Sequence, residues 1–148
     1  MKRIFLPFVA LFMILQSAVG SELTGFCVCR MTEPAGIVRT AQFTWQTSSG
    51  KPNVKQMAYR LRVAASKEDL KAGHNLLWDS ERTNSDESIN VPYQGRRLPY
   101  ESRVFWQVEI WLNTGEHLTS PVQSFLTGLK QFSREAQWIG KDETAKNN

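Results

Sequence analysis

The sequence predicts an antiparallel two-sheet β-sandwich, and three observations lead to this all-β fold class. Apolar residues alternate with polar ones in several segments, as in strands that bury one face. Clusters of turn-forming residues separate these segments, and a single short segment has helical features. About seven short strands with one helical turn fit two packed sheets, whereas helical architectures need long segments of period 3.6.

The first twenty residues have the pattern of an export signal rather than of a strand. Two basic residues precede an apolar run over 4–15, and Ala18 and Gly20 are small residues at positions −3 and −1 of a cleavage site. The apolar run is shorter than the ~20 residues that a membrane-spanning helix needs. We therefore expect a signal peptide over 1–20, export, and no membrane attachment after cleavage.

The remaining elements follow in chain order from the alternation and the turns. Ser66 is a candidate N-cap with Asp69 three residues later, and Gly73 is a candidate stop, which predicts a short helix over 66–73. Trp45 is the expected core tryptophan. Strands are expected at 43–45, 59–63, 104–110 and 122–127, with a weaker one at 88–91. The sandwich should span 21–140 and a polar tail 141–148.

The two cysteines, Cys27 and Cys29, are separated by one residue and share one face of an extended strand. Zinc sites have wider spacings and further ligands, and only His74 and His117 are available. A bridge between such close strand neighbours would be strained. We expect two half-buried thiols on an edge strand, with no metal and no cofactor.

The charge balance argues against a nucleic-acid partner. The formal net charge of the whole chain is +4, but removing the signal peptide takes Lys and Arg from 18 to 16 against 14 acidic residues, so the exported chain carries +2. This charge is small and evenly spread, whereas nucleic-acid-binding domains concentrate basic residues on one surface.

Catalytic signatures are absent from the sequence. There is no glycine-rich phosphate loop, nucleophile elbow or zinc-protease motif. The two histidines lie beside turn residues and are expected to be exposed bystanders. The densest acidic cluster should cap turns or remain solvated rather than form a glycosidase pair; its members are Asp79, Glu81, Asp86 and Glu87. No catalytic residue is therefore predicted.

Aromatic residues are the remaining functional candidates. On the strand at 104–110, Phe105 and Trp111 have the opposite phase to the inward residues, and Trp138 precedes the polar tail. An outward aromatic ring can stack on a sugar or pack against a neighbouring domain. We name these three residues as candidates for an interface or for sugar stacking.

A dozen short motifs, in register from about Phe26 to Gly140, resemble the N-terminal fibronectin-type-III/immunoglobulin-like domain of bacterial α-L-rhamnosidases. They include the segments 55–66, 77–80 (Leu-Trp-Asp-Ser), 105–108 (Phe-Trp-Gln-Val), 125–129 and 138–140 (Trp-Ile-Gly). A single piece such as Trp-Asp-Ser is a weak signal, and the specificity lies in the dozen pieces that occur in register. The chain departs from the family at Val104, where a tyrosine usually ties a corner of the sandwich. In such a sandwich, Gly95 and Gly115 suit tight turns that need unusual backbone angles.

The resemblance implies that these enzymes hydrolyse α-L-rhamnosides with inversion, using two carboxyl groups in an (α/α)6 barrel downstream of this domain. It implies a bacterial protein that is periplasmic or extracellular. We expect an accessory domain, from a truncated or fragmentary chain, whose partners are the downstream rhamnosidase domains. A stand-alone module that binds rhamnose-containing glycans is the alternative hypothesis, and an isolated enzyme is the third.

Overall fold

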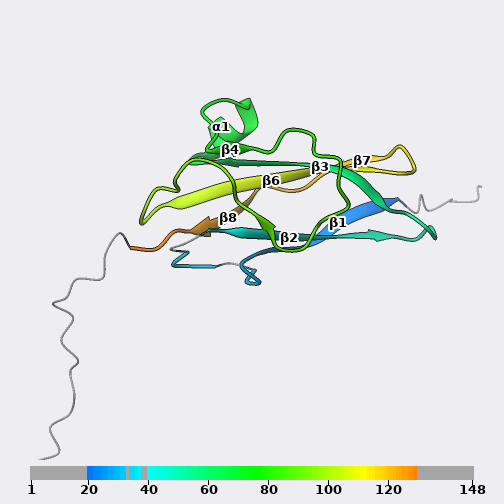
Figure 1. The fold of residues 1–148 in the computed structure, drawn as a ribbon, viewed down its shortest axis with the longest axis horizontal. Coiled ribbons are helices and arrows are strands. Elements are labelled where there is room, and N and C mark those ends of the chain that lie inside the picture. Colours follow the sequence, from blue (N-terminus) through cyan, green and yellow to red (C-terminus); the bar gives the residue numbers. More distant parts are fainter. Residues whose placement is uncertain (1–19, 33, 38–39, 130–148) are drawn as a thin grey trace, which may run out of the picture.

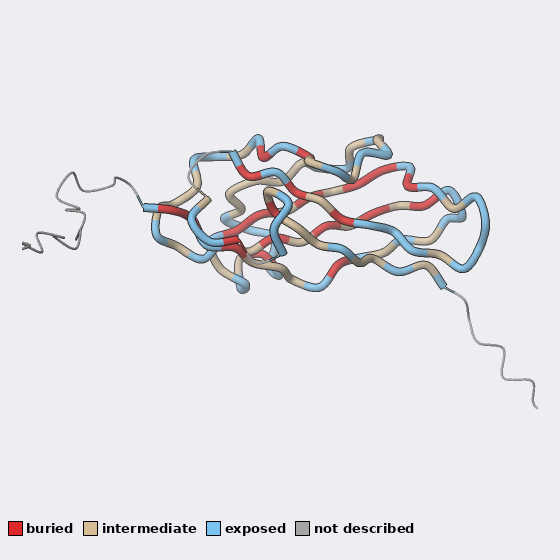
Figure 2. Tube along the Cα trace, turned by 90° about the horizontal axis from the view of Figure 1, so that it is seen from below, coloured by how far each residue is buried: buried red, intermediate tan, exposed pale blue. Residues whose placement is uncertain are grey.

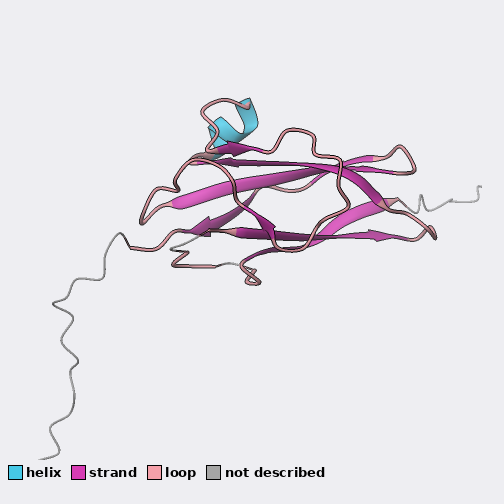
Figure 3. Ribbon diagram, viewed as in Figure 1, coloured by secondary structure: helices cyan, strands magenta, loops and turns pink. Residues whose placement is uncertain are grey.

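The computed structural model describes residues 20–32, 34–37 and 40–129, and within these ranges the chain folds into two sheets and one helix (Figures 1 and 3). The predicted signal peptide up to residue 19, the tail 141–148 and Trp138 lie outside the described residues. The elements are β1 (Ser21–Val28), β2 (Gln42–Ser49), β3 (Gln56–Ala64), α1 (Lys67–Ala72), β4 (Trp78–Asp79), β5 (Val91–Pro92), β6 (Arg103–Leu112), β7 (His117–Thr119) and β8 (Gln123–Leu126).

The two sheets are antiparallel throughout, which confirms the predicted all-β sandwich. The smaller sheet has the strand order β1-β2-β5, and the larger has β4-β3-β6-β7, with β8 also paired to β6. The pairing of β3 with β6 is the longest and runs from Gln56 opposite Leu112 to Ala64 opposite Phe105. Figure 1 shows the sheets as two layers, with the described chain beginning at one end and leaving at the opposite end.

The core lies between the two layers, and Figure 2 shows that buried positions recur along the strands. Along β6 every second residue from Val104 to Leu112 is buried, as the alternation predicted. Trp45 is fully buried, which confirms it as the core tryptophan, and its Nε1 donates a hydrogen bond to Oε1 of Gln56 at 2.9 Å. That bond removes the cost of burying the indole N–H in an apolar core.

The single described helix, α1, confirms the predicted short helix. The hydroxyl of Ser66 accepts a hydrogen bond from the Asp69 backbone N–H at 3.0 Å, and Gly73 ends the helix with φ of 71°. Leu70 is fully buried, and α1 contacts β3 and β6. Within the described residues, no helix has the length and apolarity needed to span a bilayer.

Three local predictions need correction. β4 and β7 were not expected, because two or three residues are too few for an alternation to show. Only Val91 of the segment 88–91 is in a strand, although the Ser88 carbonyl accepts a hydrogen bond from Trp45 N–H at 2.9 Å. Cys27 lies on the edge strand β1 as predicted, but Cys29 follows its end with φ of 51°; both thiols are free and half-buried.

Two of the positions singled out by the resemblance lie as expected. Gly115 has φ of 85°, a left-handed conformation that favours glycine at the turn between β6 and β7. Val104 is fully buried, so it keeps the apolar contact at the position where a tyrosine is usual. Valine cannot make the backbone hydrogen bond of the usual tyrosine hydroxyl, so we expect this corner to be looser than in the family.

Candidate interaction surfaces

The outer face of the larger sheet carries two of the three aromatic candidates. Phe105 and Trp111 are half-buried and alternate with the fully buried residues of β6, so the predicted phase is confirmed. Their role stays a prediction, and Trp138 is outside the described residues.

Both of these aromatic rings already contact cationic or ionisable side chains. The Lys67 ammonium lies 5.6 Å from the centre of the Phe105 ring, and the Arg82 guanidinium carbon lies 4.8 Å from the centre of the Trp111 ring. The His117 imidazole stacks on Trp111 with ring centres 4.7 Å apart and planes 15° apart. Such cation–π and stacking contacts stabilise the rings where they are. A sugar would have to displace them before it could stack.

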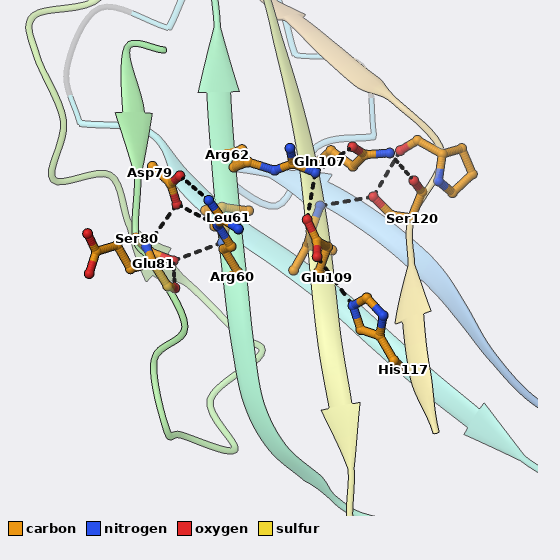
Figure 4. Close-up of polar contacts among 12 residues, drawn as sticks. Arg60, Leu61, Arg62, Asp79, Ser80, Glu81, Gln107, Glu109, His117 and Ser120 are labelled. Atoms are coloured by element: carbon orange, nitrogen blue, oxygen red, sulfur yellow. Dashed lines mark hydrogen bonds and ion pairs between the residues drawn. The ribbon is translucent and has the colours of Figure 1, made fainter. Parts of the chain in front are cut away.

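The charges on this face also have partners (Figure 4). Arg60 binds both carboxylate oxygens of Asp79, with Nε–Oδ1 at 3.0 Å and Nη2–Oδ2 at 2.7 Å. Arg62 Nη2 donates to Oε1 of Glu109 at 2.6 Å, while the other oxygen of Glu109 lies 3.2 Å from His117 Nε2. On the outer face, Arg60 and Arg62 are therefore paired with carboxylates, whereas Lys67 and Arg82 contact aromatic rings.

Asp79 shows how the acidic cluster is used. Its hydrogen bond from Arg60, more than any other cause, lowers the pKa of the carboxyl group below its ordinary value. The same carboxylate accepts a hydrogen bond from Glu81 N–H at 2.9 Å, and Ser80 Oγ accepts one from Leu61 N–H at 2.8 Å. The predicted turn contact of Asp79 is confirmed, but its ion pair with Arg60 was not predicted.

The two histidines differ from each other. His74 is exposed as expected, and its Nδ1 lies 2.9 Å from the Asp69 carboxylate. His117 is also exposed as predicted, but it is no loop bystander, because it belongs to β7 and contacts both Trp111 and Glu109. Among the described residues, no group of three or more His, Cys, Asp or Glu side chains could hold a metal ion.

A second surface lies where the described chain ends. We call it the C-terminal end, and it consists of the segments 34–37, 96–103 and 126–129. Backbone hydrogen bonds hold the segments together: Ile37 N–H donates to the Leu126 carbonyl at 3.2 Å, Gly128 N–H to the Ile37 carbonyl at 3.0 Å, and Glu101 N–H to the Gly128 carbonyl at 3.0 Å. Three distant parts of the sequence thus form one continuous, anchored surface.

The C-terminal end is hollowed and exposes apolar side chains. A hollow of about 370 Å³ lies between the segments 34–37 and 126–129 and is lined mainly by apolar atoms, including Leu126 and Leu129. These leucines are 38% and 50% exposed. Neighbouring hollows of about 270 and 510 Å³ lie beside Arg103 and beside Arg96 and Arg97. Because these leucines gather around a hollow rather than lie singly on the surface, we take the C-terminal end as a candidate contact surface.

The arginines of the C-terminal end have neutral partners, unlike those of the outer face. Arg96 Nη2 donates to the Leu76 carbonyl at 2.6 Å, and Arg103 Nη1 donates to Ser124 Oγ at 3.0 Å. Arg97 lies over the Tyr100 ring, 4.8 Å from its centre, and binds its hydroxyl. Within the part of the chain that the structure describes, none of the three arginines pairs with a carboxylate.

Tyr93 and Gly95 support this surface from beneath. The Tyr93 hydroxyl lies 2.5 Å from the Arg96 carbonyl, to which it donates, and burial raises the pKa of Tyr93 to about 12. Gly95 corrects one expectation, since its φ is not positive. It is needed because a Cβ there would lie 2.4 Å from Trp78 Cβ and 2.5 Å from the Leu77 carbonyl oxygen. Close packing, rather than backbone angle, requires glycine.

Sequence reasoning missed the C-terminal end because its parts are far apart in the chain. Ile37 and Thr127 meet in a parallel bridge that no local pattern foreshadows. One signal was available: the adjacent Arg96 and Arg97 follow a glycine and precede Leu-Pro-Tyr, an unusual concentration of arginine and apolar residues in one loop.

Comparison with known proteins decides the family. The family described as "Rha78A-like, N-terminal immunoglobulin domain" matches residues 24–131. The chain belongs to this family. The match begins in β1 and includes every later strand and the helix, so the predicted resemblance is confirmed over nearly all of the described fold.

Individual relatives of this Rha78A-like domain are much longer proteins. Two α-L-rhamnosidases, from Formosa agariphila and Streptomyces avermitilis, are each 37% identical over 100 residues, which is 66% of this chain but 11% and 10% of theirs. The crystal structure of the Streptomyces avermitilis enzyme complexed with L-rhamnose superposes with a TM-score of 0.68 and 32% identity, over 74% of this chain and 11% of that one. The structure of the α-L-rhamnosidase from Dictyoglumus thermophilum superposes with a TM-score of 0.67 and 28% identity, over 72% of this chain and 12% of that one.

This chain therefore spans about a tenth of the length of these relatives. Since the matched domain is N-terminal in its family, the rest of a relative follows the C-terminal side of the domain. In this fold, the C-terminal side of the domain is the surface on which Leu126 and Leu129 are exposed.

Proposed function

We propose that the chain is an exported, non-catalytic accessory domain of an α-L-rhamnosidase, which packs against the domains that follow it and supports them. The exposed leucines of the C-terminal end carry this proposal. They surround an apolar hollow beside the last described residue, where the next domain of a relative would begin. Covering them would remove apolar surface from water.

Hydrolysis of rhamnosides belongs, in this proposal, to the part of the relatives that the chain does not match. Glycoside hydrolysis with inversion needs two carboxyl groups roughly 6.5–9.5 Å apart across a cleft, one of them free to accept a proton. Asp79 is held ionised by Arg60 and Glu109 is shared by Arg62 and His117, so both are committed to the sheet.

Export is the second part of the proposal and rests on the signal-peptide pattern of residues 1–20. When the gene is expressed in a bacterial host, the secreted or periplasmic chain should begin at Ser21. Mass spectrometry of the purified chain measures this directly, and a cytoplasmic chain that still begins at Met1 would contradict export.

Packing against the following domains can be tested by sedimentation. The Streptomyces avermitilis α-L-rhamnosidase without its N-terminal immunoglobulin domain serves as the partner, since its own domain is 37% identical to this chain. We expect the mixture to sediment as a complex. Two independent species, with this chain as a monomer, would contradict the proposal.

A further inference from the structure

We infer that the C-terminal end recognises an acidic surface, one on which carboxylate side chains surround an apolar residue that enters the Leu126–Leu129 hollow. The inference rests on the proposed function and goes beyond it by naming the chemistry of the contacting partner. Each half of it, the charges and the apolar hollow, has its own structural argument.

The first argument comes from the charges around the three hollows. Among the described residues, Arg103 lines one hollow, Arg96 and Arg97 line another, and Glu101 lines the apolar one, so arginines outnumber carboxylates by two. Each arginine donates to a neutral oxygen through one nitrogen, so further guanidinium N–H groups remain for another acceptor. Carboxylates match a guanidinium best, because they can accept two parallel hydrogen bonds.

The second argument comes from how firmly the arginines are held. Arg97 lies on the Tyr100 ring, and Arg96 is fixed to the Leu76 carbonyl in the loop beneath it. The Arg96 carbonyl accepts the Tyr93 hydroxyl, while the Arg96 N–H donates to the Leu77 carbonyl at 3.0 Å. Arginines that are held in place lose less conformational entropy when they bind a partner.

The third argument favours a protein over an acidic polysaccharide. The apolar hollow shares Leu126 with the Arg103 hollow. Its Glu101 directly follows Tyr100, which lines the hollow beside Arg96 and Arg97. Charges and apolar surface therefore form one patch. Protein contact surfaces combine an apolar centre with charged residues at the rim, whereas a polyuronate offers carboxylates without an apolar centre.

The test is a titration of the full chain with the Streptomyces avermitilis α-L-rhamnosidase that lacks its N-terminal domain, in which calorimetry measures the binding affinity. We expect affinity to fall about tenfold between ~0.05 M and ~0.3 M NaCl, because salt screens contacts between exposed charges. The double variant Arg96→Glu/Arg97→Glu should weaken binding at least about tenfold at low salt. Leu129→Ser should weaken it at both salt concentrations, because the apolar contact is not screened.

The matched control is Lys51→Glu/Lys55→Glu, which makes the same change of charge at two exposed lysines in the loop between β2 and β3. This loop adjoins the end of β2 that pairs with Ser21, at the opposite end of the sandwich. The control should bind as the wild type does, and melting temperatures should show that all variants are folded.

Three results would overturn the inference, and they are distinguishable. Binding that is unaffected by salt and by the arginine substitutions would leave the proposed function intact but contradict an acidic partner surface. Absence of binding by the wild-type chain would contradict the proposed function itself. Binding of polygalacturonate that the arginine variant loses would assign the arginines to an acidic polysaccharide instead.

Discussion

The outer face of the larger sheet and the C-terminal end use similar residues in opposite ways. Both carry arginines next to aromatic side chains. On the outer face, Arg60 and Arg62 are paired with Asp79 and Glu109. At the C-terminal end, Arg97 has a tyrosine for a partner and exposed leucines for neighbours. The comparison shows that the partners of a side chain, more than its type or exposure, distinguish a surface whose charges are paired within the domain from one that is suited to bind another domain.

The largest expected effect comes from Gly95→Ala, which disturbs the loop beneath the C-terminal end. A Cβ would meet Trp78, the Leu77 carbonyl and the Tyr93 hydroxyl at 2.4–2.6 Å, and two of these atoms belong to fixed groups. We expect the free energy of unfolding to fall by about 3 kcal/mol, as for severe overpacking. Urea denaturation measures it.

The control for Gly95→Ala is Gly36→Ala at the same end of the sandwich. A Cβ at Gly36 meets nothing within 4 Å, but its φ of 80° makes alanine strained. The cost should be only about 1 kcal/mol. Equal effects of the two variants would show that the close packing around Gly95 is not what holds this loop.

A second prediction compares how much stability the protein loses when an arginine contact is removed on each of the two surfaces. Glu109→Gln leaves the largely buried Arg62 and the nearby His117 without their carboxylate, and should cost about 2 kcal/mol of stability. Arg97→Gln removes an exposed arginine that has no carboxylate partner among the described residues, and should cost less than about 0.5 kcal/mol. If Arg97→Gln were the more destabilising variant, the contrast between the surfaces would be wrong.

A third prediction concerns the pH dependence of the outer face. Because Arg60 lowers the pKa of folded Asp79 below its unfolded value, ionised Asp79 stabilises the fold above about pH 4 and loses this contribution as pH falls through the lowered pKa. This stabilisation should be below about 1 kcal/mol, since the Arg60–Asp79 pair is partly exposed.

The variant Asp79→Asn should therefore be less stable than the wild type at neutral pH and should lose less stability on acidification. Urea midpoints measured at neutral and at acidic pH will show this. A wild-type loss on acidification that the variant reproduces in full would contradict this role.

The smallest expected effect is that of free sugar on the outer face. The Trp111 ring already contacts Arg82 and His117, so millimolar rhamnose should leave tryptophan fluorescence unchanged. A saturable change that Trp111→Ala abolishes would favour the alternative, a module that binds rhamnose-containing glycans, over a self-contained surface.

The fold was largely predictable because its long strands bury every second residue. The alternation of Val104, Trp106 and Val108 predicts β6 and the outward phase of Phe105, and Ser66 with Gly73 predicts the helix. The two-residue strand β4 forms only because β3 offers its edge at Arg62 and Val63. That pairing is a property of the assembled sheet, so no local pattern contains it.

The candidate surfaces were only partly predictable. Phe105 and Trp111 could be placed on a face from their phase, but their contacts with Lys67 and Arg82 come from segments far along the chain. The C-terminal end depends on a parallel bridge between Ile37 and Thr127, ninety residues apart in sequence. Such a surface exists only after the two sheets have packed.

Side-chain footprinting with hydroxyl radicals tests the central claim most directly. The full chain is oxidised alone and together with the Streptomyces avermitilis enzyme that lacks its N-terminal domain. We predict that oxidation of Tyr100, Leu126 and Leu129 falls in the mixture while that of Phe105 and Trp111 is unchanged. Protection of Phe105 and Trp111, with Leu129 still fully reactive, would contradict the account.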